Sequence, residues 1–326
     1  MDQFLLFLIS LGIISYVCWI IATLRSAKWV LRFLEMGMFV IALLLLWTVF
    51  KLNLDFGLIL SIATIFAGLS WFLGKFLKIR NLLEESKSYF WILLVILFIR
   101  SFWYEPYQIP SSSMEPGLQI GDFVLVNKYV FGLKIPGTTI SINKGFIPER
   151  GDVAVFYPPH TLCKAMPEDA RPDLANIDIL ESQLFLSRFL SLQNARCTRL
   201  GTKYVKRVVG LPGDTIQLSG HELWVNGKKA KKELLNSEEG NKLFEETLGN
   251  SIHIIRTNDK SLYSEHKWII PEGKYLAIGD NRDNSLDSRD WGYFSEKYLI
   301  GKAEFIWLHW GSFSEFPTLK RNSRIR

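Results

Sequence analysis

The chain has 326 residues, of which 48% are hydrophobic and 21% charged, and its formal net charge is +6 at pH 7. This length allows a membrane region and one sizeable globular domain. The basic residues are scattered or flank apolar runs, and no helix-turn-helix, RNA-binding or zinc-finger pattern accompanies them. The charge therefore favours contact with membrane lipid and excludes nucleic acid as the expected partner.

Residues 1–104 are dominated by Leu, Ile, Phe and Val, whereas residues 105–326 have an ordinary globular composition. Up to four runs in the first part are long and apolar enough to be transmembrane helices. They lie at approximately residues 3–23, 30–50, 54–74 and 88–104. The first run lacks a charged start and a small-residue cleavage site, so we expect an anchor and not a removed signal peptide.

Basic residues between these runs predict the orientation of the chain. They follow the first run at Arg25, Lys28 and Arg32, and they lie between the third and fourth at Lys75, Lys78, Arg80 and Lys87. The positive-inside rule places both loops in the cytoplasm. Residues 105–326 are therefore expected on the outer side of the membrane.

A serine cluster, Ser111-Ser112-Ser113, follows the fourth run directly and lies between Pro110 and Pro116. The prolines restrict the backbone on both sides of the hydroxyl groups. A serine hydroxyl is a weak nucleophile until a neighbouring base takes its proton. By itself, such a cluster is more typical of a solvated loop.

After Pro110 the pattern changes to short β-type runs that are bounded by Gly and Asp turns, which predicts a mainly-β domain. Asn226-Gly227 is a strong hairpin signal. Two insertions interrupt the pattern, at approximately 159–203 and 228–250. We expect an amphipathic helix over 177–192 in the first, whereas the second is charged and reads as a solvated excursion.

Cys163 and Cys197 bracket the first insertion. In an oxidising compartment they could close a disulfide worth roughly 3–4 kcal/mol of loop entropy. The alternative is a pair of free thiols in an apolar environment.

Lys206 lies inside the apolar run Tyr204–Val209, where Tyr204, Lys206 and Val208 share one strand face. Either Lys206 or Arg207 must then meet whichever face is covered. Burial lowers the pKa of a lysine and allows it to act as a base. The alternative is an edge-strand lysine that keeps its ammonium group in water. With the serine cluster, this lysine predicts a Ser–Lys hydrolase at a membrane surface.

The run Gly279–Asp290 is dense in Asp, Asn, Ser and Arg, which predicts a loop held by its own hydrogen bonds and ion pairs. An ordinary polar turn or a calcium loop is the alternative, but an EF-hand needs a glycine at its sixth position and a final Glu. The sequence also lacks the H-E-x-x-H of zinc proteases. A penicillin-binding-type enzyme is disfavoured because Ser113 is not followed by Lys at the third position and no Lys-Thr-Gly occurs.

Taken in order, these motifs resemble those of type I signal peptidases (leader peptidases), over approximately residues 88–311. The resemblance implies N-terminal transmembrane helices followed by a mainly-β catalytic domain with an antiparallel, barrel-like sheet. It implies a serine endopeptidase that cleaves signal peptides from preproteins through an acyl-enzyme, without metal or cofactor. It further implies a multi-pass protein of the bacterial inner membrane, with its catalytic domain on the periplasmic side and the export machinery as a partner. Four spans would exceed the one or two that are common in this family.

The resemblance also implies roles for the matching residues. Ser113 would be the nucleophile and Lys206 the general base. Ser111 would donate to the oxyanion, and Ser285 would orient the lysine amine. Supporting roles, as an ion pair or in shaping the polar loop, fall to Asp280, Arg282, Asp287 and Arg289. Shallow pockets for small substrate side chains would be lined by Ile109, Met114, Leu118, Tyr204 and Val205.

Two other functions stay open at this point. One is a Ser–Lys peptidase dedicated to a single precursor, of the pilus or conjugation type, which the range of substrates would distinguish. The other is a non-catalytic membrane protein that only binds signal peptides.

Overall fold

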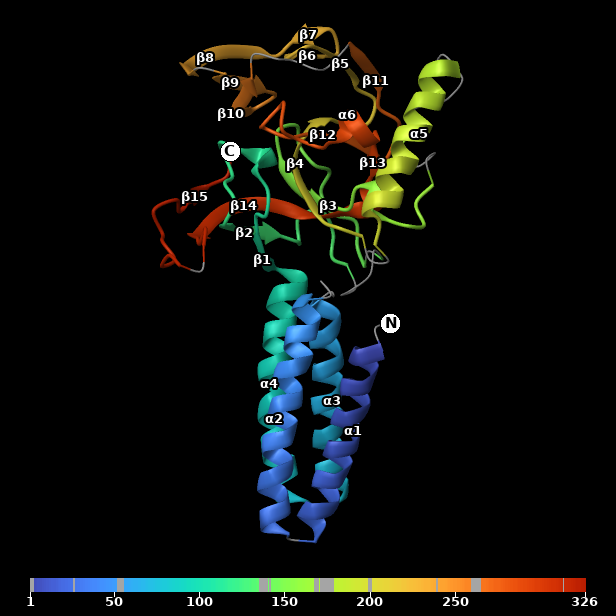
Figure 1. The fold of residues 1–326 in the computed structure, drawn as a ribbon, viewed down its shortest axis with the longest axis vertical. Helices are drawn as coiled ribbons and strands as arrows, with labels where there is room; N and C mark the ends of the chain where they lie inside the picture. Colours follow the sequence, from blue (N-terminus) through green and yellow to red (C-terminus); the bar gives the residue numbers. More distant parts are fainter. Residues whose placement is uncertain are drawn as a thin grey trace. The chain divides into compact units, whose positions relative to one another are not determined.

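The structure is a computed structural model that describes residues 3–25, 27–51, 56–134, 140, 142–166, 170, 179–198, 201–238, 240–258, 265–312 and 314–326. The chain separates into two compact units, Met1–Phe98 and Ile99–Arg326 (Figure 1). The division comes a few residues before the predicted boundary at 104. Arg100 Nη2 pairs with Glu105 Oε1 at 2.5 Å, which ties the last helical turn to the sheet domain.

The first unit is helical. Its helices are α1 (Gln3–Leu24), α2 (Lys28–Lys51), α3 (Phe56–Phe76) and most of α4 (Arg80–Phe102). Each predicted apolar run is helical over most of its described residues, whereas residues 54 and 55 lie outside them. Helix α4 begins earlier than expected, and Tyr104 already belongs to a strand. Among the described residues, two helical stretches are long and apolar enough to cross a membrane, Gln3–Leu24 and Ile59–Phe76, with mean hydropathies of 2.5 and 1.6. The number of spans stays a prediction.

The second unit is built on antiparallel sheets, as the sequence predicted. The strands of the largest sheet are β1 (Tyr104–Gln108), β2 (Asp122–Asn127), β3 (Val153–Phe156), β4 (Tyr204–Gly210), β12 (Lys274–Ile278), β13 (Phe294–Ser295), β14 (Leu299–His309) and β15 (Ser323–Arg324). Their order is β1-β2-β14-β3-β4-β12-β13, with β15 paired to β14. Strand β4, which carries Lys206, therefore lies inside this sheet, between β3 and β12.

A second sheet contains the predicted hairpin turn. Its strands are β5 (Thr215–Ser219), β6 (Glu222–Val225), β7 (Lys228–Lys229) and β11 (His266–Ile269), in the order β11-β5-β6-β7. Asn226 and Gly227 join β6 to β7 with φ angles of 52° and 77°. Both are in the left-handed region that this type of tight turn requires, which confirms the turn prediction.

The third sheet corrects in part the prediction of a solvated excursion over 228–250. Its strands are β8 (Lys231–Glu238), β9 (Asn241–Leu248) and β10 (Ser251–Asn258), in the order β10-β9-β8. The segment thus forms strands, and although β8 is mostly exposed, the end of β9 is buried. The many charged residues suggested a solvated segment, but β9 buries Glu246 and Leu248. The charge of Glu246 is compatible with burial because a buried arginine pairs with it.

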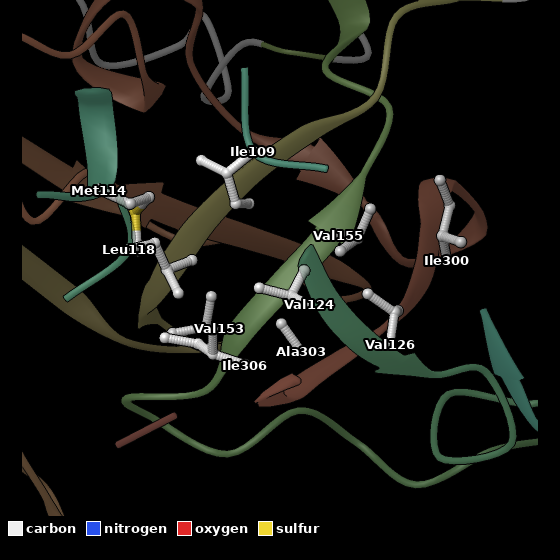
Figure 2. Close-up of a cluster of buried hydrophobic side chains, with 10 residues drawn as sticks. All are labelled: Ile109, Met114, Leu118, Val124, Val126, Val153, Val155, Ile300, Ala303 and Ile306. Carbon is white, nitrogen blue, oxygen red and sulfur yellow. The ribbon is translucent and has the colours of Figure 1, made fainter. Parts of the chain in front are cut away.

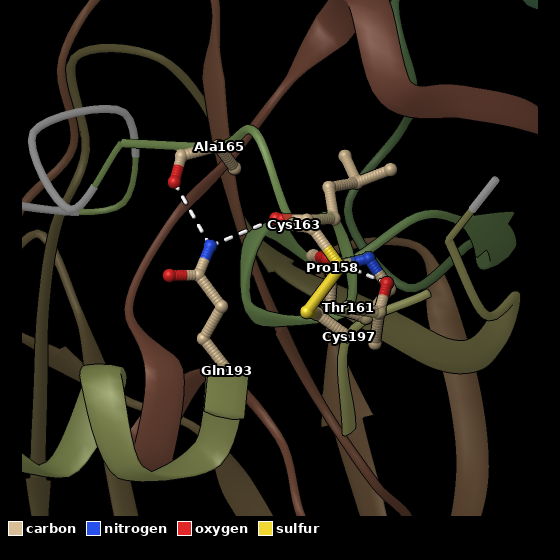
Figure 3. Close-up of a disulfide and its surroundings, with 7 residues drawn as sticks. Pro158, Thr161, Cys163, Ala165, Gln193 and Cys197 are labelled. Carbon is tan, nitrogen blue, oxygen red and sulfur yellow. Dashed lines mark hydrogen bonds between the residues drawn. A yellow bond between two sulfur atoms is a disulfide. The ribbon is translucent and has the colours of Figure 1, made fainter. Parts of the chain in front are cut away.

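Helices of different lengths lie between the strands in the chain. They are η1 (Ser112–Met114), η2 (Pro159–Thr161), α5 (Ile179–Arg196), α6 (Ser288–Trp291) and η5 (Glu296–Tyr298). Helix α5 confirms the amphipathic helix expected in the first insertion. Cys163 and Cys197 form a disulfide just beyond its end, with a Cα–Cα distance of 5.0 Å (Figure 3). Gln193 Nε2 donates to the carbonyl oxygens of Leu162 and Ala165 at 2.8 and 2.9 Å, which fixes the end of α5 to the η2 segment.

The hydrophobic core beside η1 holds the serine cluster in position. Strand β2 alternates buried and half-buried residues, so that Val124 and Val126 face inward. Figure 2 shows the cluster that these residues join, which gathers side chains from the chain around η1 and from β2, β3 and β14. Its buried members are Ile109, Met114, Leu118, Val124, Val126, Val153, Val155, Ile300, Ala303 and Ile306.

Candidate functional site

Ser113 is the middle residue of η1, the single turn of 3₁₀ helix in the connection between β1 and β2. The next residue, Met114, is only 1% exposed and anchors this turn in the core. The Ile109 amide also donates to the Asp122 carbonyl oxygen at 2.8 Å, which continues the β1–β2 pairing up to the serine cluster. Ser113 itself is 9% exposed. Ser113 thus lies at the edge of a packed region.

Lys206 approaches Ser113 from β4, where it is paired with Ala154 of β3. Lys206 Nζ is hydrogen-bonded to Ser113 Oγ, although 93 residues separate the two in the sequence. Lys206 is 3% exposed, so the alternative of a solvated edge-strand lysine is wrong. Arg207 is buried as well, so both faces of β4 are covered at this point.

Burial lowers the pKa of Lys206 to about 8, because the protonated amine loses hydration. The carboxylates of Asp287 and Asp280 act in the opposite direction, and the cation of Arg289 adds to the lowering. A pKa near 8 leaves a useful fraction of neutral amine at neutral pH. This is the property that a lysine needs to take a proton from a serine hydroxyl.

Ser111 and Ser285 are the two further hydroxyls predicted at the site. Ser111 Oγ lies 3.3 Å from Ser113 Oγ, within reach of any group that Ser113 attacks. Ser285 is buried next to Asp287. The structure describes both Ser285 and Lys206, and no hydrogen bond joins Ser285 Oγ to the lysine amine.

Gly279 was part of the predicted polar run but was not singled out. A Cβ atom on this residue would lie 2.2 Å from Ser285 Oγ and 2.5 Å from the Ser113 carbonyl oxygen. The end of β12 therefore approaches the nucleophile segment more closely than any larger residue allows. A glycine directly after a strand and before a dense polar run was the available sequence signal.

Asp287 and Arg289 form the predicted ion pair. Arg289 Nε donates to Asp287 Oδ1 and Arg289 Nη2 to Asp287 Oδ2, both at 2.8 Å. Asp287 also caps the start of α6 and accepts a hydrogen bond from the Gly279 amide at 2.9 Å. Burial opposes ionisation of Asp287, but the adjacent Arg289 and these hydrogen bonds hold the pKa of this carboxyl below its usual range.

Asp280 and Arg282 each bind a residue outside the polar loop. Arg207 donates to Asp280 from Nε at 2.8 Å and from Nη2 at 2.7 Å, with both side chains buried. Arg282 pairs with Glu246 of β9. Burial raises the pKa of Glu246, yet Arg282 and the nearby His253 bring it down to about 2. Sequence reasoning missed Arg207 and Glu246 as partners, since neither lies near the loop in the chain.

The structure brings together four of the five predicted substrate-binding residues. Ile109, Met114 and Leu118 belong to the core cluster of Figure 2. Val205 packs against this cluster. The half-buried Tyr204 packs instead on the neighbouring cluster of Phe156 and Trp291. The role of these five residues in binding substrate stays a prediction.

Known proteins match this chain over most of its length. The family model described as "Signal peptidase, peptidase S26" matches residues 82–310. Signal peptidase I of Pseudomonas aeruginosa is 35% identical over 269 residues, which cover 76% of this chain and 81% of that protein. Signal peptidase I of Haemophilus influenzae is 30% identical over 318 residues, covering 79% and 87%. A crystal structure of a signal peptidase I from Enterococcus faecalis V583 aligns with 50% of this chain and 98% of that chain, at 20% identity and a TM-score of 0.26.

Proposed function

Since the chain belongs to the signal peptidase family, peptidase S26, we propose that it removes signal peptides from exported precursor proteins, with Ser113 as nucleophile and Lys206 as general base. The observation that carries this proposal is the hydrogen bond between Lys206 Nζ and Ser113 Oγ inside a buried site. A buried lysine with a lowered pKa has no evident structural benefit, because its desolvation costs stability. As the base of a hydrolase, it is required.

The reaction follows from this geometry. The neutral Lys206 amine takes the hydroxyl proton while Ser113 Oγ attacks the scissile carbonyl carbon. The amide C–N bond then breaks, the lysine returns its proton to the leaving amine, and an acyl-enzyme remains. Lys206 next takes a proton from a water molecule as its oxygen attacks the ester carbon. The acyl C–Oγ bond then breaks, Lys206 returns the proton to Ser113 Oγ, and the signal peptide leaves.

The negative charge that develops on the carbonyl oxygen needs donors. The Ser113 backbone N–H and the Ser111 hydroxyl are the two that we assign, and the 3.3 Å between the Ser111 and Ser113 Oγ atoms supports this role. One such donor is typically worth ~10²–10³ in turnover. Strand β1 stands at one end of its sheet, so an extended peptide can add to it and present its cleavage site to the dyad.

The decisive test is cleavage of a purified precursor protein by the detergent-solubilised chain, read as a mass shift at the signal-peptide junction. Wild type should cleave, and Ser113→Ala and Lys206→Met should not. Cleavage by the Ser113→Ala variant would refute the nucleophile. Cleavage of one precursor among many would favour a dedicated peptidase, and no cleavage by wild type would favour a binding protein.

The membrane topology is a further part of the proposal. We propose a multi-pass protein of the bacterial inner membrane, with residues 105–326 on the periplasmic side, where preproteins emerge from the export machinery. The apolar helices and the basic loops around Arg25 and Lys78 support it. Protease added to spheroplasts should digest the sheet domain, whereas protection of this domain until lysis would refute the orientation.

A further inference from the structure

We propose that Arg256 is a positioning residue, which holds the nucleophile segment and the polar loop around Lys206 in one fixed arrangement. Arg256 lies in β10, in the three-stranded sheet whose other strands, β8 and β9, were not predicted. This inference rests on the proposed function, because it concerns the geometry of the Ser113–Lys206 dyad.

The side chain of Arg256 binds the nucleophile segment. Arg256 Nη1 donates to Glu115 Oε2 at 2.6 Å, and Glu115 is the second residue after Ser113. The two side chains are 33% and 21% exposed. The contact is a charge-assisted hydrogen bond that water only partly screens.

The backbone of Arg256 binds the polar loop. Its amide donates to the Asp280 carbonyl oxygen at 2.8 Å, and its carbonyl oxygen accepts from the Arg282 amide at 2.8 Å. This isolated parallel bridge between Arg256 and Asn281 fixes the loop at the carboxylate of Asp280, which acts on the pKa of Lys206. Arg256 therefore binds the nucleophile segment through its side chain and the polar loop through its backbone.

Asn281 connects the polar loop directly to the nucleophile segment. The Asn281 amide donates to the Ser113 carbonyl oxygen at 3.1 Å, and Asn281 Nδ2 donates to the Ser112 carbonyl oxygen at 3.0 Å. The path Ser113–Glu115–Arg256–Asn281–Ser113 is thus a closed ring of covalent and hydrogen bonds. Its side-chain link, Arg256 to Glu115, can be cut without disturbing the backbone pairing.

The ring has a consequence for catalysis because dyad geometry must be held within fractions of an ångström. The turn η1 is a short helix in a loop, and loops are the least rigid supports for a reacting group. A displacement of about 1 Å can cost ~10²-fold in rate. The competing explanation is an ordinary surface ion pair, whose removal changes little.

The test compares kcat and KM on one precursor peptide for wild type, Arg256→Met, Glu115→Met and the double variant. Each single change should lower kcat by about 10–100-fold with KM within about threefold, because attack geometry and not binding is lost. The double variant should be no slower than the worse single variant, because both cut the same link. Arg256→Lys, which keeps the charge but not the forked geometry, should fall between wild type and Arg256→Met.

Lys302→Met is the matched control. It breaks the Lys302–Asp152 pair, which has the same 2.6 Å separation and a similarly exposed cation, on β14. We expect its kcat to stay within about twofold of wild type. If Arg256→Met fails to fold, Glu115→Met decides the question, since it removes the acceptor and keeps a side chain of similar length.

Single variants within twofold of wild type would overturn the positioning role, as would effects that multiply in the double variant or that reside in KM. The wild-type arm separates this inference from the proposed function. A wild type that does not cleave refutes the function, whereas a cleaving wild type with unaffected Glu115→Met refutes only the role of Arg256.

Discussion

The depressed pKa of Lys206 predicts a specific pH dependence of activity. Protonation is the perturbation, since only the neutral amine can accept the proton of Ser113. Burial lowers the pKa of Lys206 to about 8. The sign follows directly: the active, neutral form dominates above this pH, and activity is lost as the pH falls through it.

The magnitude follows from the fraction of neutral amine. With a pKa of about 8, roughly 1% of the enzyme is active at pH 6, about 9% at pH 7 and about 90% at pH 9. We therefore expect kcat/KM to rise about 90-fold between pH 6 and pH 9 and then to level off. A solvated lysine with the ordinary pKa of about 10.4 would instead give a rise of about tenfold per pH unit up to pH 10.

The assay is kcat/KM on a precursor peptide that carries no group titrating between pH 6 and pH 10, because this ratio reports the free enzyme. Circular dichroism at each pH controls for unfolding. A profile flat from pH 6 to pH 10 would refute the neutral-lysine mechanism. A continuous rise to pH 10 would refute the reasoning that burial sets the pKa.

Three further predictions concern packing and stability. Gly279→Ala should lower kcat by about 100-fold, because its Cβ has no room beside the nucleophile segment. The control Gly117→Ala, whose Cβ would meet nothing closer than 3.6 Å, should keep kcat within about threefold of wild type. Equal effects of the two changes on kcat would contradict this explanation. Arg207→Met should lower the free energy of unfolding by about 3–5 kcal/mol in denaturant titrations, because it leaves the buried Asp280 carboxylate without its partner. A loss under 1 kcal/mol would show that the ion pair is dispensable for stability. Cys163→Ser should lower the free energy of unfolding by about 3–4 kcal/mol, because the disulfide to Cys197 closes a loop with a sequence separation of 34. If the mass of wild type is the same with and without reductant, no disulfide forms.

Much of the fold could be predicted because local patterns carry it. The short apolar run Phe123–Val126 after the Gly121-Asp122 turn signal predicted β2, and the Asn226-Gly227 turn predicted a hairpin from the backbone angles that such residues adopt easily. The prediction for the second insertion, residues 228–250, was incomplete for an equally local reason. Its charges indicated solvent, while the residue that makes Glu246 compatible with burial, Arg282, lies 36 residues further along the chain.

The sequence alone shows which chemical groups are present: a constrained serine cluster, a lysine in an apolar strand, and a polar loop that follows strand β12. These are properties of neighbouring residues, so a linear pattern can express them. Only the tertiary structure decided which groups meet. Sheet order and register bring Lys206 to Ser113 across 93 residues, pair Arg207 with Asp280, and bring Arg256 to Glu115. Such contacts depend on how the whole chain packs, and no local pattern contains that information.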